Sequence, residues 1–322
     1  MSTPEAATDL ITVVSPARNE ADGIEAFHQR LVAAVAEIPE ASWEFIYVDD
    51  GSTDATFAKL SDIASGDDRV RVLRLSRNFG HQLAITCGLD HSNGDAVVVI
   101  DSDLQDPPEI IAEMVVLWRG GADVAYGQRR HRSGETWFKR ASASTYYRLI
   151  SRLSEVDIPE QVGDFRLMDR LVVDGLKGMR EENRYIRGMI SWTGFDQRPV
   201  YYDRDARHAG KSSYSLVKMI NLAVNGITSF TEKPLRIASF VGAAIFAATV
   251  LLAAYILLGK LLDPTGSDPG FATITLLIMF FGSVQLLSIG LLGEYVGRIY
   301  RESKSRPLYL VRADVTRQNT GS

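Results

Sequence analysis

Two aspartates separated by one residue, Asp101 and Asp103, follow the apolar run of residues 96–100. Such a run predicts a buried strand, and across a local turn the two carboxylates could converge on one divalent cation. Gln105 could add a neutral oxygen, and oxygen ligands of this kind suit Mg²⁺ or Mn²⁺. In isolation, an acidic turn or a helix N-cap before residues 107–109 would be the favoured interpretation of this triplet. The surrounding sequence has to decide between them.

Short apolar runs that end in polar residues recur along the first half of the chain, at residues 10–14, 44–48, 70–75 and 96–100. Residues 24–38 lie between the first two runs and repeat apolar side chains at helical spacing, as do residues 57–63 after the second run. The alternation predicts an α/β domain with a mainly parallel sheet covered by helices on both faces. A fifth strand is expected at residues 123–127.

Ligands of such sheets bind beyond the carboxyl ends of the parallel strands. The polar segments at those ends are therefore candidates for a binding site: residues 16–20, 49–54, 76–82 and 101–106. Asp49 and Asp50 belong to the second of them. A turn before Gly51, with Asp54 capping the following helix, explains this acidic pair without any ligand.

Several functional classes are disfavoured by composition and missing motifs. The sequence contains no Gly-x-Gly turn for a dinucleotide and no Walker glycine-lysine loop. A net charge of −5 argues against a nucleic-acid-binding protein, which normally carries a basic surface. Cys87 is the lone cysteine, so no internal disulfide forms, and we expect it to be a small core residue in a cytosolic setting. The five histidines show no metal-binding spacing.

Two uncharged apolar runs, residues 237–258 and 272–292, follow the α/β part. They contain 22 and 21 residues, and about 20 helical residues cross a bilayer core of roughly 30 Å. We therefore predict two transmembrane helices. A buried helical hairpin in a soluble protein is the alternative.

The flanks of these runs predict their orientation. Lys233 and Arg236 precede the first run, several basic residues follow the second, and the connector carries Lys260 against Asp263 and Asp268. By the positive-inside bias both chain ends are cytoplasmic, in a multi-pass protein of the plasma membrane. Residues 215–231 repeat apolar residues near helical spacing, which is typical of a helix in the membrane interface or of an ordinary core helix.

We thus expect four parts along the chain. They are a cytoplasmic catalytic domain (residues 1–214), an amphipathic juxtamembrane segment (215–235), two transmembrane helices (236–294) and a cytoplasmic tail (295–322), of which residues 303–322 are expected to be a loose end.

Six motifs follow one another in the cytoplasmic part: VSPARNE (14–20), VDDGSTD (48–54), SRNFGHQ (76–82), IDSDLQDPPE (100–109), GDFRLMD (163–169) and residues 204–214. With the two apolar runs after them, they resemble the family 2 glycosyltransferases, and within these the polyprenyl-phosphate glycosyltransferases. The resemblance implies a GT-A fold, a nucleotide-sugar donor and a polyprenyl phosphate acceptor. Arg18 stands where the family usually has Tyr, and Ser102 where it often has Ala, so the preferred base and sugar stay open.

The resemblance also implies roles for individual residues. Asp101, Asp103 and Gln105 would hold Mg²⁺ or Mn²⁺ against the donor diphosphate. Asp103 and Asp164 are the expected catalytic residues, Asp164 either as a base or as an electrostatic partner on the acceptor side. His81 lies in a matched motif and could touch the substrate, but packing on a helix surface or in a polar environment is the favoured interpretation. The donor nucleotide is expected to be bound by Pro16, Ala17, Asn19, Glu20, Asp49, Asp50, Asp101 and Ser102.

The acceptor phosphate needs cations more than it needs a base. A phosphate monoester has a second pKa near 6, so it is already mostly a dianion at pH 7. Even two unit charges 4 Å apart repel each other by about 4 kcal/mol at an effective dielectric constant near 20. Cationic side chains should therefore bind the acceptor. The candidates form two clusters, of which the first is Arg129, Arg132, Lys139 and Arg140, and the second is Arg204, Arg207 and Lys211.

The leading function is inverting transfer of a sugar from a nucleotide-sugar, expected to be UDP-linked, to a polyprenyl phosphate at the cytoplasmic membrane face. A processive polysaccharide synthase is an alternative, but it would need a Gln-x-x-Arg-Trp motif and further spans, which this chain lacks. A non-catalytic membrane scaffold is the other alternative, and losing the metal-binding carboxylates would favour it. The resemblance implies a homo-oligomer formed through the membrane helices, and the net charge of −5 disfavours a nucleic-acid partner.

Overall fold

The structure is a computed structural model of the 322-residue chain, and it describes residues 8–38, 40–130, 162–182, 184–203 and 270–316, with scattered positions between 242 and 258. These residues divide into two compact units. The first contains the described residues between 8 and 203 together with 307–316, and the second contains the described residues between 242 and 306.

The helices and strands of the described residues follow in this order: β1 (Asp9–Ala17), α1 (Ile24–Ala36), β2 (Ala41–Asp49), α2 (Thr56–Gly66), β3 (Val70–Leu75), α3 (His81–His91), β4 (Ala96–Val99), the 3₁₀ helix η1 (Pro108–Ile110), α4 (Ile111–Arg119), β5 (Val124–Arg129), β6 (Val162–Asp169), α6 (Arg170–Gly178), α7 (Ile186–Thr193), β7 (Gln197–Tyr202), α10 (Phe271–Ser303) and β8 (Val311–Val315).

Eight strands form one sheet in the order β7-β5-β6-β4-β1-β2-β3-β8. The central strands β3, β2, β1 and β4 run parallel, and β7 is parallel to β5. β6 and β8 are antiparallel to their neighbours. The α/β domain with a mostly parallel sheet predicted from the sequence is confirmed, and all five expected strands are present.

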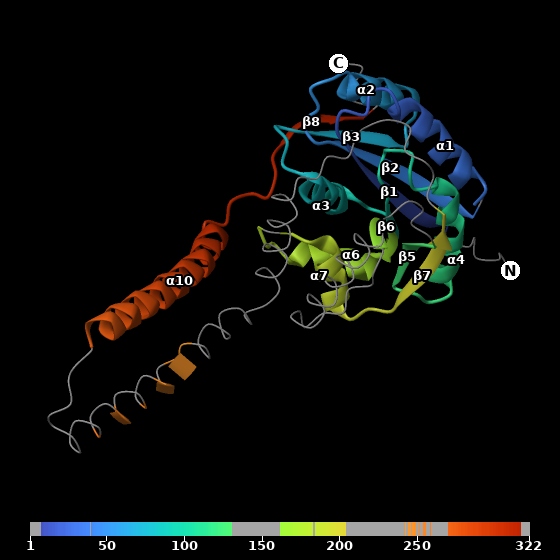
Figure 1. The fold of residues 1–322 in the computed structure, drawn as a ribbon. Helices are drawn as coiled ribbons and strands as arrows, with labels where there is room; N and C mark the ends of the chain where they lie inside the picture. The colour runs from blue at the N-terminus through green and yellow to red at the C-terminus, as the bar shows by residue number, and fades with distance from the viewer. Residues whose placement is uncertain are drawn as a thin grey trace. The chain divides into compact units, whose positions relative to one another are not determined.

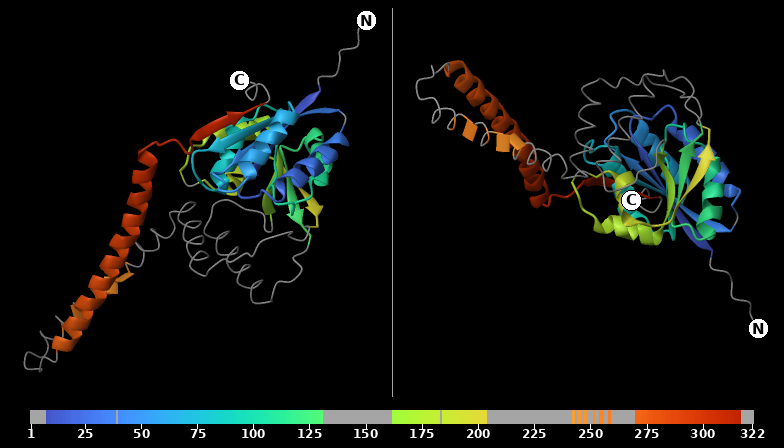
Figure 2. Two further views of the ribbon diagram at one scale, coloured as in Figure 1. Left: turned by 90° about the horizontal axis from the view of Figure 1, so that it is seen from above. Right: turned by 60° about the horizontal axis from the view of Figure 1, so that its bottom comes forward.

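Helices cover both faces of the sheet (Figure 1, Figure 2). Side chains alternate along β1, so that Ile11 and Val13 pack with α1, α2 and α4, while Val14 packs with α3, α6 and α7 on the other face. The stripe predicted at residues 24–38 forms the buried side of α1, where Phe27 and Leu31 are fully buried. The two apolar layers hold the strand ends that carry the candidate site.

The lone cysteine lies in the second layer. Cys87 is fully buried on α3, as expected for a core residue, and burial raises the pKa of its thiol to about 12. Because the thiolate is the reactive form, we expect no reaction of the native protein with a thiol reagent at pH 8. Reaction should be complete in guanidinium chloride, and absorbance of released thionitrobenzoate measures both. Rapid labelling of the native protein would contradict the burial.

The prediction of a loose end at residues 303–322 is wrong for the part that the structure describes. Val311–Val315 forms β8 and pairs with β3 at the edge of the sheet, and Asp314 accepts hydrogen bonds of 3.0 and 2.7 Å from Arg71. Tyr309 donates a hydrogen bond of 2.8 Å to Asp90. The segment VRADV alternates apolar and charged residues, which is typical of an edge strand. The polar composition of the whole tail instead led to the prediction of a loose end. β8 covers backbone groups of β3 that would otherwise be exposed.

Deleting residues 309–322 should therefore destabilise the first unit. Loss of the β8 ladder and of the Tyr309–Asp90 hydrogen bond is expected to lower the unfolding temperature by about 5 °C. The exposed edge of β3 should also promote self-association. Differential scanning fluorimetry and light scattering in detergent measure these effects, with deletion of residues 317–322 as the control. Equal unfolding temperatures for the two truncations would contradict a stabilising role of β8.

In the second unit, α10 contains the second apolar run of the sequence. Its segment Phe280–Ser303 has 24 residues and contains an 18-residue window with a mean hydropathy of 1.2. By length and composition α10 is the one helix among the described residues that could cross a membrane. The helix continues past residue 292, where the predicted span ends, to Ser303. The first predicted span and the predicted juxtamembrane helix lie largely outside the described residues.

Candidate active site

The parallel strands β1, β2 and β4 end side by side and bring their polar residues together. Ala17 pairs with Asp49 at the ends of β1 and β2, and the backbone nitrogen of Asp50 donates to the carbonyl oxygen of Ala17 at 3.0 Å. After β4, the hydroxyl of Ser102 donates to the carbonyl oxygen of Pro16 at 2.9 Å. These hydrogen bonds tie the loop after each strand to its neighbour, as expected for a ligand site at a carboxyl edge.

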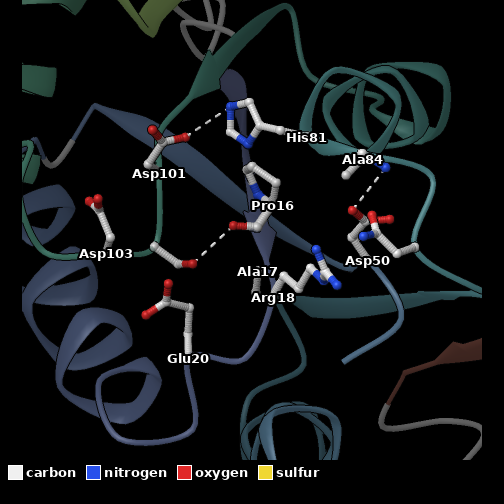
Figure 3. Close-up of a pocket in the computed structure, with 12 residues that line it drawn as sticks. Pro16, Ala17, Arg18, Glu20, Asp50, His81, Ala84, Asp101 and Asp103 are labelled. Atoms are coloured by element: carbon white, nitrogen blue, oxygen red, sulfur yellow. Dashed lines mark hydrogen bonds and ion pairs between the residues drawn. The ribbon is translucent and has the colours of Figure 1, made fainter. Parts of the chain in front are cut away.

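A cavity of about 330 Å³ opens at this edge. Figure 3 shows Asp101, Asp103 and Glu20 along one side of it, with Asp50 and Arg18 across from them. Asn19 and Asp49, which are expected to bind the donor, and Gln105, which is expected to bind the metal ion, do not line it. The lining residues are Pro16, Ala17, Arg18, Glu20, Asp50, Asn78, Gly80, His81, Ala84, Asp101, Ser102 and Asp103.

The turn after β4 points two carboxylates toward the cavity. Leu104, directly after Asp103, has a φ of 59°, a left-handed conformation that is uncommon for a side chain of this type. Asp103 accepts a hydrogen bond of 3.1 Å from the backbone nitrogen of Gln105. A functional constraint commonly holds a backbone in such a strained conformation. The Asp-x-Asp spacing in the sequence therefore corresponds to this turn, which places both carboxylates beside the cavity.

The surroundings of Asp101 suit a cation. Its Oδ1 is buried, lies 3.4 Å from Nε2 of His81 and accepts no hydrogen bond. Burial raises the pKa of this carboxyl to about 6, and His81 partly opposes that effect. A buried carboxylate oxygen without a partner is stabilised by a nearby positive charge. Among the described residues, no group of three or more His, Cys, Asp and Glu side chains is placed to hold a metal ion.

Asp49 and Asp50 have different surroundings. Asp50 lines the cavity and accepts hydrogen bonds from the backbone nitrogens of Phe79 (2.7 Å) and Gly80 (3.0 Å). Burial raises its pKa despite these hydrogen bonds. Asp49 is fully buried, accepts from the backbone nitrogen of Ser52 at 3.0 Å, and lies 3.2 Å from Nε of Arg74. The turn interpretation therefore describes Asp49, while Asp50 is placed to meet a ligand.

Asn19 and Gly51 shape the loops beside the cavity. Oδ1 of Asn19 accepts from the backbone nitrogen of Thr53 at 2.9 Å, and its own backbone nitrogen donates to Ser52 at 3.0 Å. Gly51 has a φ of 64°, and a Cβ atom there would come within 2.6 Å of the Arg77 backbone. Asn19 thus ties the loop after β1 to the loop after β2, and Gly51 allows the latter to pass close to residues 77 and 78.

Asp164 lies opposite Asp101 at the sheet edge. β6 is antiparallel to β4, and Val99 pairs with Arg166. Two positions further along the same register, Asp101 is opposite Asp164. Arg187 donates two hydrogen bonds to the Asp164 carboxylate, of 2.8 Å from Nε and 3.2 Å from Nη2. His81 and Gln82 lie 3.1 and 3.2 Å from its Oδ2. Asp164 is therefore the centre of a polar network that reaches Asp101 through His81.

This network keeps Asp164 ionised. Burial opposes its charge, but the hydrogen bonds of His81 and Arg187 outweigh burial and hold the pKa of Asp164 well below its usual range. Burial also acts to lower the pKa of His81, while Asp164 and Asp101 raise it above its ordinary value. A carboxylate with so low a pKa is a poor proton acceptor near neutral pH. The geometry favours the electrostatic role of Asp164 over that of a base.

Sequence reasoning missed three members of this network, Arg187, His81 and Gln82. Arg187 is the second residue of α7, in a region without any motif, so no sequence signal identifies it. His81 lies within the SRNFGHQ motif, where the sequence favours polar packing. The structure instead places its Nε2 3.1 Å from Asp164 and 3.4 Å from Asp101, and Figure 3 shows it facing Asp101. Its position as the first residue of α3, directly after Gly80, was the available signal.

Of the cations expected to bind the acceptor phosphate, the structure describes Arg129 alone. It ends β5, does not line the cavity, and its Nη2 lies 3.6 Å from the carboxylate of Asp106. The other expected cations lie outside the described residues: Arg132, Lys139, Arg140, Arg204, Arg207 and Lys211.

The fold is a mostly parallel sheet covered by helices, with an acidic cavity at its carboxyl edge. This arrangement is typical of nucleotide-binding α/β proteins, and sequence comparison identifies the family. Residues 12–176 match Glycosyl transferase family 2, and residues 233–299 match the GtrB C-terminal hairpin. The chain belongs to glycosyl transferase family 2, which confirms the family predicted from its motifs.

Similar proteins cover nearly the whole chain. The uncharacterized glycosyltransferase YkcC of Bacillus subtilis (strain 168) is 44% identical over 300 residues, which are 93% of this chain and 92% of that protein. The bactoprenol glucosyl transferase of Shigella phage SfX is 40% identical over 305 residues, 94% of this chain and 99% of that protein. A crystal structure of glucosyl-3-phosphoglycerate synthase from Mycobacterium tuberculosis with Mn²⁺, UDP-glucose and phosphoglyceric acid is 22% identical, with a TM-score of 0.45, over 68% of this chain and 77% of that one.

Proposed function

We propose that this protein transfers a sugar from a nucleotide-sugar to a polyprenyl phosphate, with inversion at the anomeric carbon. The observation that carries the proposal is the acidic cavity at the sheet edge, where Asp101 and Asp103 face Asp50. It occurs in a chain that is 40% identical, over 94% of its length, to a bactoprenol glucosyl transferase. The membership of glycosyl transferase family 2 supports the same reaction class.

The donor nucleotide would lie in the cavity. Asp50 and Glu20 provide carboxylate oxygens that can accept hydrogen bonds from a base N–H or from ribose hydroxyls, beside Pro16 and Ala17. A UDP-linked donor suits this arrangement, since uracil offers one such N–H. Ser102, held to the backbone of Pro16, would fix the distance between the nucleotide and the diphosphate.

Asp101 and Asp103 would hold Mg²⁺ or Mn²⁺ at the diphosphate. When bound, the ion neutralises charge that develops on the leaving nucleoside diphosphate. Because Gln105 is 5% exposed and does not line the cavity, we assign it to the support of the turn more than to the ion.

The acceptor attacks without a catalytic base. A polyprenyl phosphate is mostly a dianion at pH 7, so its oxygen can attack the anomeric carbon in line with the leaving diphosphate. An α-linked donor then yields a β-linked product, and no covalent enzyme intermediate forms. Asp164 would act through Arg187 and His81, which it holds beside the cavity as positive or hydrogen-bonding groups.

Residues 233–299 would anchor the enzyme in the membrane as two helices. Support comes from the match of this region to the GtrB C-terminal hairpin, from α10, and from the second apolar run in the sequence. Both chain ends would then be cytoplasmic by the positive-inside bias, and the catalytic domain would meet its lipid acceptor at the inner face of the plasma membrane. A homo-oligomer formed through these helices is part of the proposal.

Transfer of radiolabelled sugar from a panel of UDP- and GDP-sugars to polyprenyl phosphate tests this function. The detergent-purified protein is assayed with Mg²⁺, with Mn²⁺ and with EDTA. A labelled lipid that is extracted into organic solvent and requires the metal is expected. Labelled polymer would indicate a processive synthase, and a folded protein without any product would favour the scaffold.

A further inference from the structure

Three residues from separate elements form a buried polar cluster next to the site, which we call the Asp106 cluster: Asp106, Arg129 and Tyr202. Asp106 is 1% exposed, and Tyr202, which is 2% exposed, donates a hydrogen bond of 2.7 Å to it. Arg129 lies 3.6 Å from Asp106 through Nη2 and donates from Nε to the Tyr202 hydroxyl at 3.4 Å. A carboxylate so deeply buried is stable when it has such partners.

Two glycines leave the space that this cluster occupies. A Cβ atom on Gly127 would lie 2.8 Å from the ring of Tyr202, and one on Gly163 would lie 3.1 Å from Nη2 of Arg129. Tyr202 also packs edge-on against Phe165, with ring centroids 6.0 Å apart. The packing around the cluster therefore holds each side chain in one position.

Each member of the cluster lies next to a segment with an expected role at the site. Asp106 ends the segment 101–106, whose Asp101 and Asp103 face the cavity. Arg129 is the last residue of β5, and Arg132 and Lys139 follow it in the sequence. Tyr202 is the last residue of β7, and Arg204 and Arg207 follow it. The cluster thus joins residues 101–106, which we call the donor turn, to the starts of both segments that carry the expected acceptor-binding cations.

We propose that Asp106 is a positioning residue, which holds the ends of β5 and β7 against the donor turn and so sets where the acceptor phosphate is bound relative to the donor. This inference rests on the proposed function. Donor binding depends less on the cluster, because Asp50 and Glu20 follow β2 and β1, on other strands.

Asp106→Asn tests the inference. Asparagine keeps an oxygen that can accept from Tyr202 but removes the charge that faces Arg129. We expect the KM for polyprenyl phosphate to rise about tenfold, with the KM for the nucleotide-sugar changed by less than about twofold. An unchanged acceptor KM together with a lower unfolding temperature would show a merely structural role and overturn the proposal.

Tyr202→Phe keeps the ring packing and removes the shared hydroxyl, so it provides a second test that does not depend on how well the first variant folds. It should raise the acceptor KM in the same way, and the double variant should show little more than the larger single effect, since both act through one cluster. Tyr201→Phe is the matched control, because Tyr201 is 51% exposed and adjacent in sequence. Independent, additive effects would overturn the coupling.

A wild-type protein that neither binds nor uses polyprenyl phosphate would instead refute the proposed function, and this inference with it.

Discussion

Asp103→Asn is expected to lower the rate of sugar transfer about 10²–10³-fold, which is the usual effect of removing one electrostatic contact to the leaving group. Asp103 lines the cavity beside Asp101, whose Oδ1 is buried without a hydrogen-bond partner. With one of the two carboxylates neutral, the divalent ion should bind more weakly and neutralise less charge on the diphosphate. Product formation at saturating donor and acceptor, over a range of Mn²⁺ concentrations, measures the loss.

Two controls separate this effect from misfolding. Asp62→Asn makes the same chemical change at an exposed position of α2 and should leave the transfer rate unchanged. Calorimetric titration with Mn²⁺ should show weaker binding by the Asp103 variant, while its unfolding temperature stays within about 2 °C of the wild type. A variant that remains active without added metal would refute the assignment of Asp103.

Asp164→Asn is expected to lower both activity and stability. The transfer rate should fall about 10²-fold, because Arg187 and His81 lose the carboxylate that holds them beside the cavity. The free energy of unfolding should fall by about 3 kcal/mol, the lower end for breaking a buried ion pair. The lower end applies because Asp164 is 6% exposed but the Arg187 side chain is 29% exposed and can be solvated.

The pH dependence distinguishes an ion-pair partner from a base. Since the pKa of folded Asp164 is lowered, its stabilising contribution is fully present above the ordinary Asp pKa of about 4 and is lost as the pH falls through the folded pKa. The difference in unfolding free energy between wild type and Asp164→Asn should therefore shrink below about pH 4. Between about pH 9 and pH 5 it should grow as the pH falls, because Asp164 raises the pKa of His81 and so stabilises the protonated imidazole.

Chemical denaturation across this pH range measures the difference. Asp174→Asn is the matched control, because Asp174 forms an exposed ion pair of 3.7 Å with Arg170, and such pairs contribute about 0–1 kcal/mol. A kcat profile whose limb near neutral pH disappears in Asp164→Asn would contradict the electrostatic role and identify a base.

Local pattern determined the strands and helices that build the donor side. A buried strand appears in the sequence as a short apolar run, and an amphipathic helix repeats apolar residues about every 3.6 positions. β1 to β5 and the buried face of α1 could therefore be predicted from the sequence. β8 escaped prediction because five alternating residues at an edge bury little apolar area, and its pairing with β3 joins positions more than 230 residues apart.

The candidate site divides in the same way. The sequence by itself determined that Asp101, Asp103, Asp50 and Glu20 would meet, because parallel strands end at one edge and the polar residues follow those ends directly. It also identified Asp164 through a motif that resembles the family's.

Only the tertiary structure decided what these groups contact. Asp49 turned inward to Arg74 while Asp50 faced the cavity, and Arg187 reached Asp164 from a helix without a motif. Arg129 joined Asp106 and Tyr202, which come from three different elements. The spacing of residues along the chain predicts which side chains lie close together only when they belong to the same strand or helix. The side chain that meets a charge depends on the packing of elements distant in sequence, and that packing also sets how far a carboxylate is buried and therefore where its pKa lies.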